Sequence, residues 1–148
     1  FEKAFLMLGA PQIGVRHSRR LVGLAKVTRS QWDDGKVWDD EIGVSTSLSP
    51  KFPNISVPYG ALVPQGIDGV LGAGRHLACD AGSHTFLREI PQCWLSGQAA
   101  GVAAALAANA GVVPRLLNTR LIQRELLRQG TYLSPSVVAL AELSSAAE

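Results

Sequence analysis

Arginine and histidine side chains gather in two short stretches of the sequence. The first stretch holds Arg16, His17, Arg19 and Arg20, and the second holds His84 and Arg88. Guanidinium groups at turn or helical spacing can grip a phosphate or a carboxylate through paired hydrogen bonds. The alternative for the first stretch is a solvated basic patch, or ion pairs with the acidic segment 33–41. His76 and His84 could transfer protons, although no nucleophile or carboxylate stands at a fixed spacing from either ring.

A helix of very small residues is predicted from about Cys93 to Ala110, in the stretch "QCWLSGQAAGVAAALAANAG", with Gly111 as its C-cap. The first N–H groups of a helix lack internal partners and its dipole is positive there, so electron-rich ligand oxygens are stabilised at this end. Gly97 and Gly101 form a G-x-x-x-G pair, which lets a backbone or a flat ring come close. The alternative is a core helix packed tightly against a sheet.

The segment "GAGR", residues 72–75, resembles part of a dinucleotide-binding fingerprint. The third glycine of G-x-G-x-x-G is absent, because Leu77 stands in its place, and no helix is predicted to follow. Glycine admits positive φ, so a ligand could approach the main chain at this turn. A plain tight turn is the alternative.

The other predicted elements are short. We expect a helix or its remnant over 1–10, a turn and then a strand within 14–27, a polar stretch over 28–41, strand fragments over 42–57, strands over 57–64 and 70–74, and an irregular stretch over 75–92. A helix is expected near Asn118–Gln129, with Leu117, Leu121, Ile122 and Leu126 as its buried stripe and Gly130 as its end. The remainder is expected to form a last helical turn or a tail.

Composition excludes several classes of protein. The chain has 148 residues, 47% hydrophobic and 18% charged, which is enough for one domain with a core. A net charge of +2 argues against a general nucleic-acid binder, and no apolar run is long enough to span a membrane. The carboxylates of Asp33, Asp34, Asp39, Asp40 and Glu41 lack metal-loop spacing and are predicted to form a solvated face. Cys79 and Cys93 match no zinc or C-x-x-C spacing and are expected to be free thiols, which suits a reduced, cytoplasmic setting.

Four motifs in this order resemble the C-terminal part of the FAD-dependent oxidoreductase family: "GVRHSRRLVG", "VPYGALVPQGIDGVLGAGR", "IPQC…SGQAAGVAAALA" and "LIQRELLRQGTYL". The resemblance covers about residues 1–133 and implies an α/β fold, the glutathione-reductase-like flavoprotein fold, with FAD as cofactor and a small-molecule substrate. The family's usual form of the first motif is "GVRESRR", so His17 stands where Glu is common.

The resemblance also implies the site residues. Gly74 and Arg75 would lie near the pyrophosphate or ribityl of FAD, and Ile90, Pro91 and Gln92 beside the isoalloxazine. The amides of Gly97, Gln98 and Ala99 would face the pyrimidine edge of the flavin. Arg16, Arg19 and Arg88 are candidate substrate contacts, and no metal is expected.

One family feature is absent from these residues, namely the N-terminal βαβ unit with G-x-G-x-x-G that holds the ADP half of FAD. We therefore expect this chain to be the C-terminal portion of a Rossmann-like flavoprotein, and to bind FAD weakly on its own. Residues 1–57 would form the end of the substrate region, 58–133 would form the returning part of the FAD-binding domain, and 134–148 would be a tail. The missing half would come from the same or a separate chain. The alternatives are a non-catalytic interaction subunit and a standalone α/β ligand-binding domain without flavin.

Overall fold

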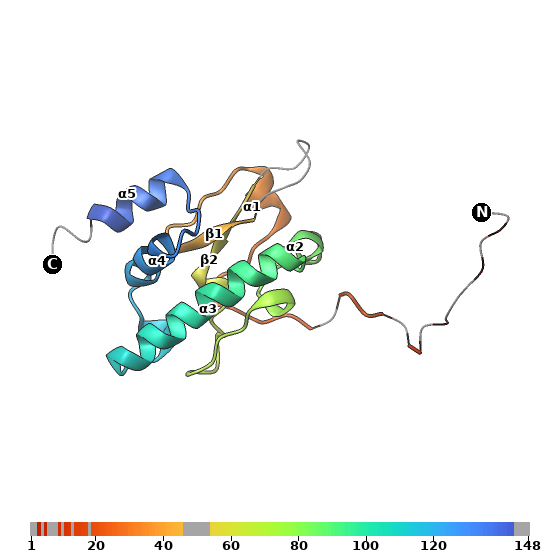
Figure 1. Cartoon of the computed structure of the whole chain (residues 1–148), viewed down its shortest axis with the longest axis horizontal. Coiled ribbons are helices and arrows are strands. Elements are labelled where there is room, and N and C mark those ends of the chain that lie inside the picture. The colour runs from red at the N-terminus through yellow and green to blue at the C-terminus, as the bar shows by residue number, and fades with distance from the viewer. Residues whose placement is uncertain are drawn as a thin grey trace.

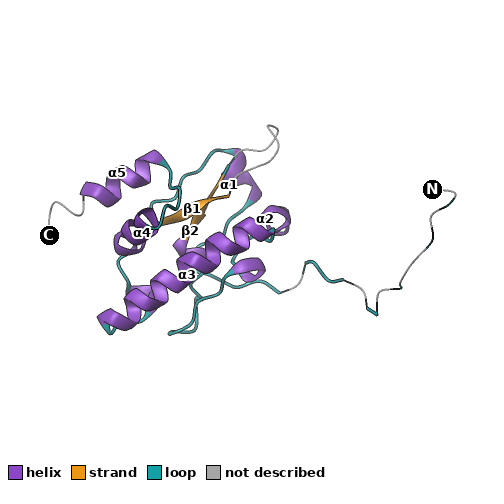
Figure 2. Ribbon diagram, in the orientation of Figure 1, coloured by secondary structure: helices purple, strands orange, loops and turns teal. Residues whose placement is uncertain are grey.

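The computed structural model describes residues 3, 5, 9, 11–12, 14–17, 19–45 and 54–143. Its helices and strands are α1 Arg29–Asp33, β1 Glu41–Ser45, β2 Ile55–Pro58, α2 Ala81–Leu87, α3 Ile90–Ala110, α4 Thr119–Arg128 and α5 Pro135–Leu143, with short 3₁₀ turns at Tyr59–Ala61, Gly74–His76 and Pro114–Leu116 (Figure 1). This mixture of helices and a small sheet is compatible with the α/β class (Figure 2). Most of the predicted helix over 1–10 lies outside the described residues.

The long helix α3 crosses one face of the molecule and contacts most of the other elements (Figure 1). The prediction of this helix is confirmed, although it begins at Ile90, three residues earlier than expected, and it ends at Gly111 in the left-handed conformation with φ of 66°. Ala99, Ala103 and Ala107 lie on its buried side, spaced four residues apart, which brings the helix close to β1 and α4. The small side chains therefore serve close packing on this side.

Strands β1 and β2 pair antiparallel, and the register shifts between Glu41 and Gly43. Beside this pair, the extended segment 21–27 lies between two other stretches of chain: Leu24 donates its backbone N–H to Val63, and Val27 donates to Ala78. The strand predicted within 14–27 is reduced here to isolated bridges at Gly23 and Val27. The expected domain boundary at 57/58 falls inside β2.

Two sequence-based predictions in the middle of the chain were wrong. The strand predicted over 70–74 is irregular chain that enters the 3₁₀ turn at Gly74; Gly72 donates its N–H to the Leu62 carbonyl and Gly74 donates to the Ser96 hydroxyl. The stretch 75–92, expected to be irregular, contains α2, which begins because the Asp80 carboxylate accepts the Ser83 N–H at 2.7 Å.

Of the two C-terminal helices, α4 packs against α3 and α5 packs against α4. In α4, Ile122 and Leu126 are fully buried, Asn118 caps the helix through the Arg120 N–H, and Gly130 has a φ of 83° just after the helix end, which confirms that prediction. The expected tail is helix α5, which contacts α4. No helix among the described residues is long and apolar enough to cross a membrane.

The acidic segment is only partly solvated. Glu41 is completely buried, and its carboxylate accepts two hydrogen bonds from Ser134, one from the backbone N–H at 2.6 Å and one from the hydroxyl at 2.9 Å. Asp40 accepts the Gly60 N–H at 2.8 Å. The prediction of a solvated face was therefore wrong for Glu41, which joins β1 to the start of α5. Within the described part of the chain, no group of three His, Cys, Asp or Glu residues could hold a metal.

Candidate functional site

The start of α3 is open to a ligand. Glu89 precedes the helix without a capping hydrogen bond from its side chain, and Pro91 has no N–H to offer. The first intrahelical bond is that of Cys93, from its N–H to the Glu89 carbonyl, so the terminal amides are those of Ile90 and Gln92. These amides, with Ile90 65% exposed, are the positive end of the helix dipole.

Gln92 has an unusual environment. Its side-chain oxygen Oε1 is buried and has no hydrogen-bond partner among the described residues. The residue lines a small cavity of about 50 Å³ between the start of α3 and the end of β1, together with Val44, Ser45, Pro91 and Leu95. A buried amide oxygen without a donor is destabilising, typically by 1–3 kcal/mol, and a ligand donor at this position would relieve it.

The 3₁₀ turn at Gly74 lies directly against this helix end. Gly74 adopts a left-handed φ of 68°, and its N–H donates to the Ser96 hydroxyl at 2.9 Å. The Ser96 hydroxyl proton lies within reach of the carbonyls of Gln92 and Cys93, at 2.9 and 3.2 Å. The structure therefore brings the predicted residues of the turn and of the helix start together.

The predicted amide contacts of Gly97, Gln98 and Ala99 require correction. Because α3 begins at Ile90, these residues lie two turns inside the helix, where amides bond to carbonyls four residues earlier. Ala99 is fully buried, and the Gln98 side chain donates to Gln129 Oε1 at 2.9 Å. The terminal amides that could serve a flavin are those of Ile90 and Gln92 instead.

The G-x-x-x-G face of α3 points away from the described protein. A methyl group added at Gly97 or Gly101 would meet no non-neighbouring atom within 4 Å among the described residues. One turn before Gly97, the Trp94 side chain is 73% exposed on the same side. The close approach expected at the two glycines is thus not made by any described part of the chain.

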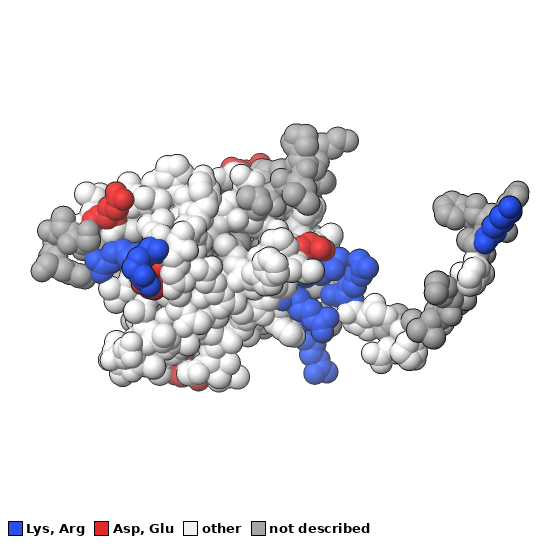
Figure 3. All heavy atoms as spheres, viewed as in Figure 1, with Lys and Arg blue, Asp and Glu red and all other residues white. Residues whose placement is uncertain are grey.

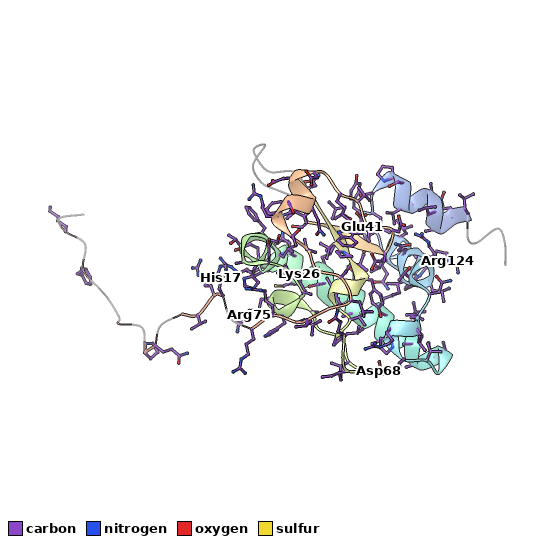
Figure 4. The ribbon with its side chains drawn as sticks, turned by 180° about the vertical axis from the view of Figure 1, so that it is seen from behind. His17, Lys26, Glu41, Asp68, Arg75 and Arg124 are labelled. Carbon is purple, nitrogen blue, oxygen red and sulfur yellow. The ribbon has the colours of Figure 1, made fainter. Side chains whose placement is uncertain are left out.

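The basic residues fall into two groups. Figure 3 shows Lys and Arg side chains gathered where the N-terminal segment reaches the body of the protein. Arg16 is exposed, and Arg19 lines a surface pocket of about 630 Å³ with Arg20 and Lys26. Arg75, which lies at the same end as His17 in Figure 4, donates to the Val15 carbonyl at 3.3 Å.

Arg88 lies at the C-terminal end of α2, one turn beyond His84. Its Nε is buried and has no partner in the described chain, while its Nη1 lies 3.5 Å from Glu89 Oε1. His84 is 1% exposed, and its Nε2 bonds to the Arg75 carbonyl at 2.9 Å. Burial, joined by the nearby charges of His17, Arg20 and Arg88, lowers the pKa of His84, although the bond to the carbonyl opposes this shift.

Sequence reasoning missed two features. The cap of α2 could have been found from "DAGS", residues 80–83. An Asp at this position is a common N-cap, because its carboxylate accepts the backbone N–H of the residue three positions later. The pairing of His17 with His84, whose rings are 4.7 Å apart and edge to face, has no signal in the sequence because the two residues are distant along the chain.

An uncapped helix start is a place where proteins in general stabilise electron-rich ligand oxygens, and here it lies beside a glycine turn. The family model described as FAD dependent oxidoreductase matches residues 1–126. The chain belongs to the FAD-dependent oxidoreductase family, and its cofactor is FAD. Searches of the curated proteins and of the solved structures gave no match.

Proposed function

We propose that this chain carries the flavin-ring end of an oxidoreductase that moves a hydride between a small-molecule substrate and FAD. The observation that carries the proposal is the uncapped start of α3, where Gln92 Oε1 is buried and no described residue donates to it. FAD supplies the redox chemistry, while the protein supplies position and electrostatics. The residues present fit such a ring. The flavin ring has hydrogen-bond donors and acceptors along one edge, and the helix start offers backbone N–H groups and the Gln92 side-chain oxygen.

Each residue around the helix start has a part in this proposal. The N–H groups of Ile90 and Gln92 would stabilise the negative charge that develops on the ring edge during reduction. Gln92 Oε1 would accept a hydrogen bond from the ring, and Pro91, which has no N–H, would pack beside it. Gly74 and Arg75, held against the helix through Ser96, would lie along the ribityl or pyrophosphate.

The ADP half of FAD would be held from outside these 148 residues, either by another part of the same protein or by a separate chain. Two observations support this: the sequence has no complete G-x-G-x-x-G unit, and the Gly97–Gly101 face of α3 is open. Glycines on an open helix face stabilise nothing within the described protein, whereas they would let a second backbone approach closely.

The alternative is a non-catalytic interaction subunit, which the same open face also favours. Flavin content separates the two functions. The 148-residue chain should purify without flavin absorbance, and co-expression with the segment that bears the G-x-G-x-x-G unit should yield a yellow complex. A colourless complex that forms stoichiometrically would support the interaction subunit and overturn the catalytic proposal.

The face of α3 provides the sharper test. Gly97→Val should leave the unfolding free energy of the 148-residue chain within about 0.5 kcal/mol of the wild type, because the position is open and the helix propensities differ little. The same change should abolish flavin retention in the complex. Ala99→Val is the matched control: Ala99 is fully buried, so overpacking should cost about 1–3 kcal/mol in the chain itself. Full flavin retention by Gly97→Val would refute the proposed covering of this face.

A further inference from the structure

His84 is a buried histidine with one nitrogen left over. Its Nε2 faces the Arg75 carbonyl at 2.9 Å, and since a carbonyl only accepts, Nε2 carries the proton. Nδ1 is buried and has no hydrogen-bond partner among the described residues. A second buried nitrogen without a described partner, Arg88 Nε, lies one helical turn away. Buried polar atoms are nearly always hydrogen-bonded, so two neighbouring residues with an unpartnered buried nitrogen indicate a binding site for a ligand.

Positive groups surround this histidine. The His17 ring meets the His84 ring edge to face at 4.7 Å, and Arg20 and Arg88 both act on His84 as like charges. The bond from Leu21 N–H to the His76 carbonyl, 2.8 Å, holds the Arg20 segment beside the turn that carries Arg75. We call His17, Arg20, His84 and Arg88 the His84 cluster.

The two nearby carboxylates, Asp80 and Glu89, have partners other than His84. Asp80 accepts the N–H groups of Arg29 and Ser83 at 3.0 and 2.7 Å. Glu89 lies 3.5 Å from Arg88 Nη1 and is 54% exposed, and neither carboxylate is among the charges that act on His84. Glu89 therefore offsets part of the charge of Arg88, whereas neither carboxylate is among the groups that act on His84.

We propose that the His84 cluster receives an oxyanion, and that this oxyanion is a carboxylate of the substrate. The guanidinium groups of Arg20 and Arg88 suit a planar carboxylate, which they can bind through paired hydrogen bonds. His17, which is exposed, packs edge to face against the buried His84. The assignment to a substrate rests on the proposed function, whereas anion binding itself does not.

The phosphates of the cofactor share this chemistry, so the experiment has two arms. The flavin-free 148-residue chain is titrated with succinate, with inorganic pyrophosphate and with uncharged succinamide, at constant ionic strength. The histidine side-chain resonances are followed by NMR. We expect saturable shifts of His17 and His84 with succinate, a rise of the His84 pKa on binding because an anion favours the charged ring, and no effect of succinamide.

Variants locate the binding. Arg88→Gln should weaken succinate binding at least tenfold, while Arg128→Gln on α4, which removes the same charge from a side chain that is 72% exposed, should leave it unchanged. His17→Glu places a carboxylate in the cluster, so it should abolish binding and raise the His84 pKa without any ligand. If Arg88→Gln does not give the amide spectrum of a folded protein, His17→Glu provides the test of the binding site.

Three outcomes would overturn the proposal. Absence of saturable succinate shifts in the millimolar range would remove the oxyanion site. If Arg88→Gln and Arg128→Gln weaken succinate binding equally, the binding is a general effect of net charge. Pyrophosphate binding tenfold tighter than succinate at the same histidines would assign the site to the cofactor and remove the substrate assignment. None of these results depends on flavin retention, so a failure here is distinct from a failure of the proposed function.

Discussion

Ser96 accepts a hydrogen bond from the backbone N–H of Gly74 at 2.9 Å, and this bond joins the glycine turn to the helix start. Ser96 is fully buried in the first half of α3, while Gly74 begins the 3₁₀ turn 22 residues earlier in the chain. The two structures that would contact opposite parts of the cofactor are therefore positioned by one hydroxyl group.

Replacing this hydroxyl should loosen the turn. Ser96→Ala leaves the Gly74 N–H without its acceptor, so we expect a loss of about 1–2 kcal/mol in the unfolding free energy. Urea denaturation measures this loss. Ser136→Ala, at an exposed position of α5, should change the stability by no more than about 0.5 kcal/mol. Equal stability of Ser96→Ala and the wild type would mean that the bond is dispensable.

The contact of β1 with α3 leaves no room for a side chain at Gly43. A Cβ atom there would clash with Leu95 Cδ1, and Gly43 has a φ of 154°. We expect Gly43→Ala to cost about 1–3 kcal/mol of unfolding free energy, by the overpacking of a close contact. Gly66→Ala is the control, because a Cβ there meets nothing within 4 Å.

The partner of the clash can be removed as well. In the double variant Gly43→Ala with Leu95→Ala, the shortened side chain makes room for the new methyl group, so the combined loss should be smaller than the sum of the single losses. Chemical denaturation of the four proteins gives the coupling. Strict additivity would show that the strain of Gly43→Ala comes from the backbone and not from Leu95.

Because Asp80 caps α2, the unfolding free energy of the protein should fall at acidic pH. Burial raises the pKa of Asp80, but hydrogen bonds from Arg29 and Ser83 outweigh this effect, and the net pKa is lowered. The folded carboxylate thus holds its proton less tightly than the unfolded one, and the contribution of Asp80 is present above pH about 4 and is lost as pH falls through the folded pKa.

Asp80→Asn tests this prediction, because asparagine caps helices about as well but does not titrate. Urea midpoints measured from neutral pH into the acid range should fall less steeply for Asp80→Asn than for the wild type. Parallel pH profiles for the two proteins would show that Asp80 does not contribute to the acid dependence.

Both cysteines should resist thiol reagents at neutral pH. Burial raises the pKa of Cys79 to about 11, and burial also raises the pKa of Cys93, which donates to the Arg88 carbonyl at 3.3 Å. Although Cys93 lies in the first turn of α3, desolvation by burial has the largest effect on its pKa. Labelling with a disulfide reagent should be slow in the native protein, accelerate as pH rises, and be complete in denaturant. Immediate native labelling of either thiol would contradict this prediction.

The long helices could be read from the sequence, whereas the shorter elements could not. Gly111 and Gly130 mark helix ends by their left-handed backbone, and Ile122 and Leu126 follow helical spacing, so α3 and α4 were predictable. The strand predicted over 70–74 failed because a short apolar run does not by itself determine strand pairing, and these residues are exposed or half-buried. The start of α3 was predicted three residues too late, at Cys93 and not at Ile90, because "IPQC" shows no capping side chain.

The site was predictable only in part, for the same physical reason. Gly74 and Gln92 were identified through the resemblance, but the role of Ser96 as their link depends on a bond across 22 residues. The neighbourhood of His84 depends on contacts with residue 17, far away along the chain. Local sequence patterns carry no information about contacts between residues distant in sequence, because tertiary packing determines those contacts.

The open side of α3 has a thermodynamic consequence. Besides Gly97 and Gly101 it exposes Ala104, Ala105 and Ala108, and neither glycine nor alanine has side-chain rotamers to lose on burial. Of the larger side chains on this side, Trp94 is exposed at the end of the row, and Gln98 already donates to Gln129. Association on this side should therefore show in calorimetry a fall in heat capacity from buried apolar surface, with little entropic penalty from ordering side chains.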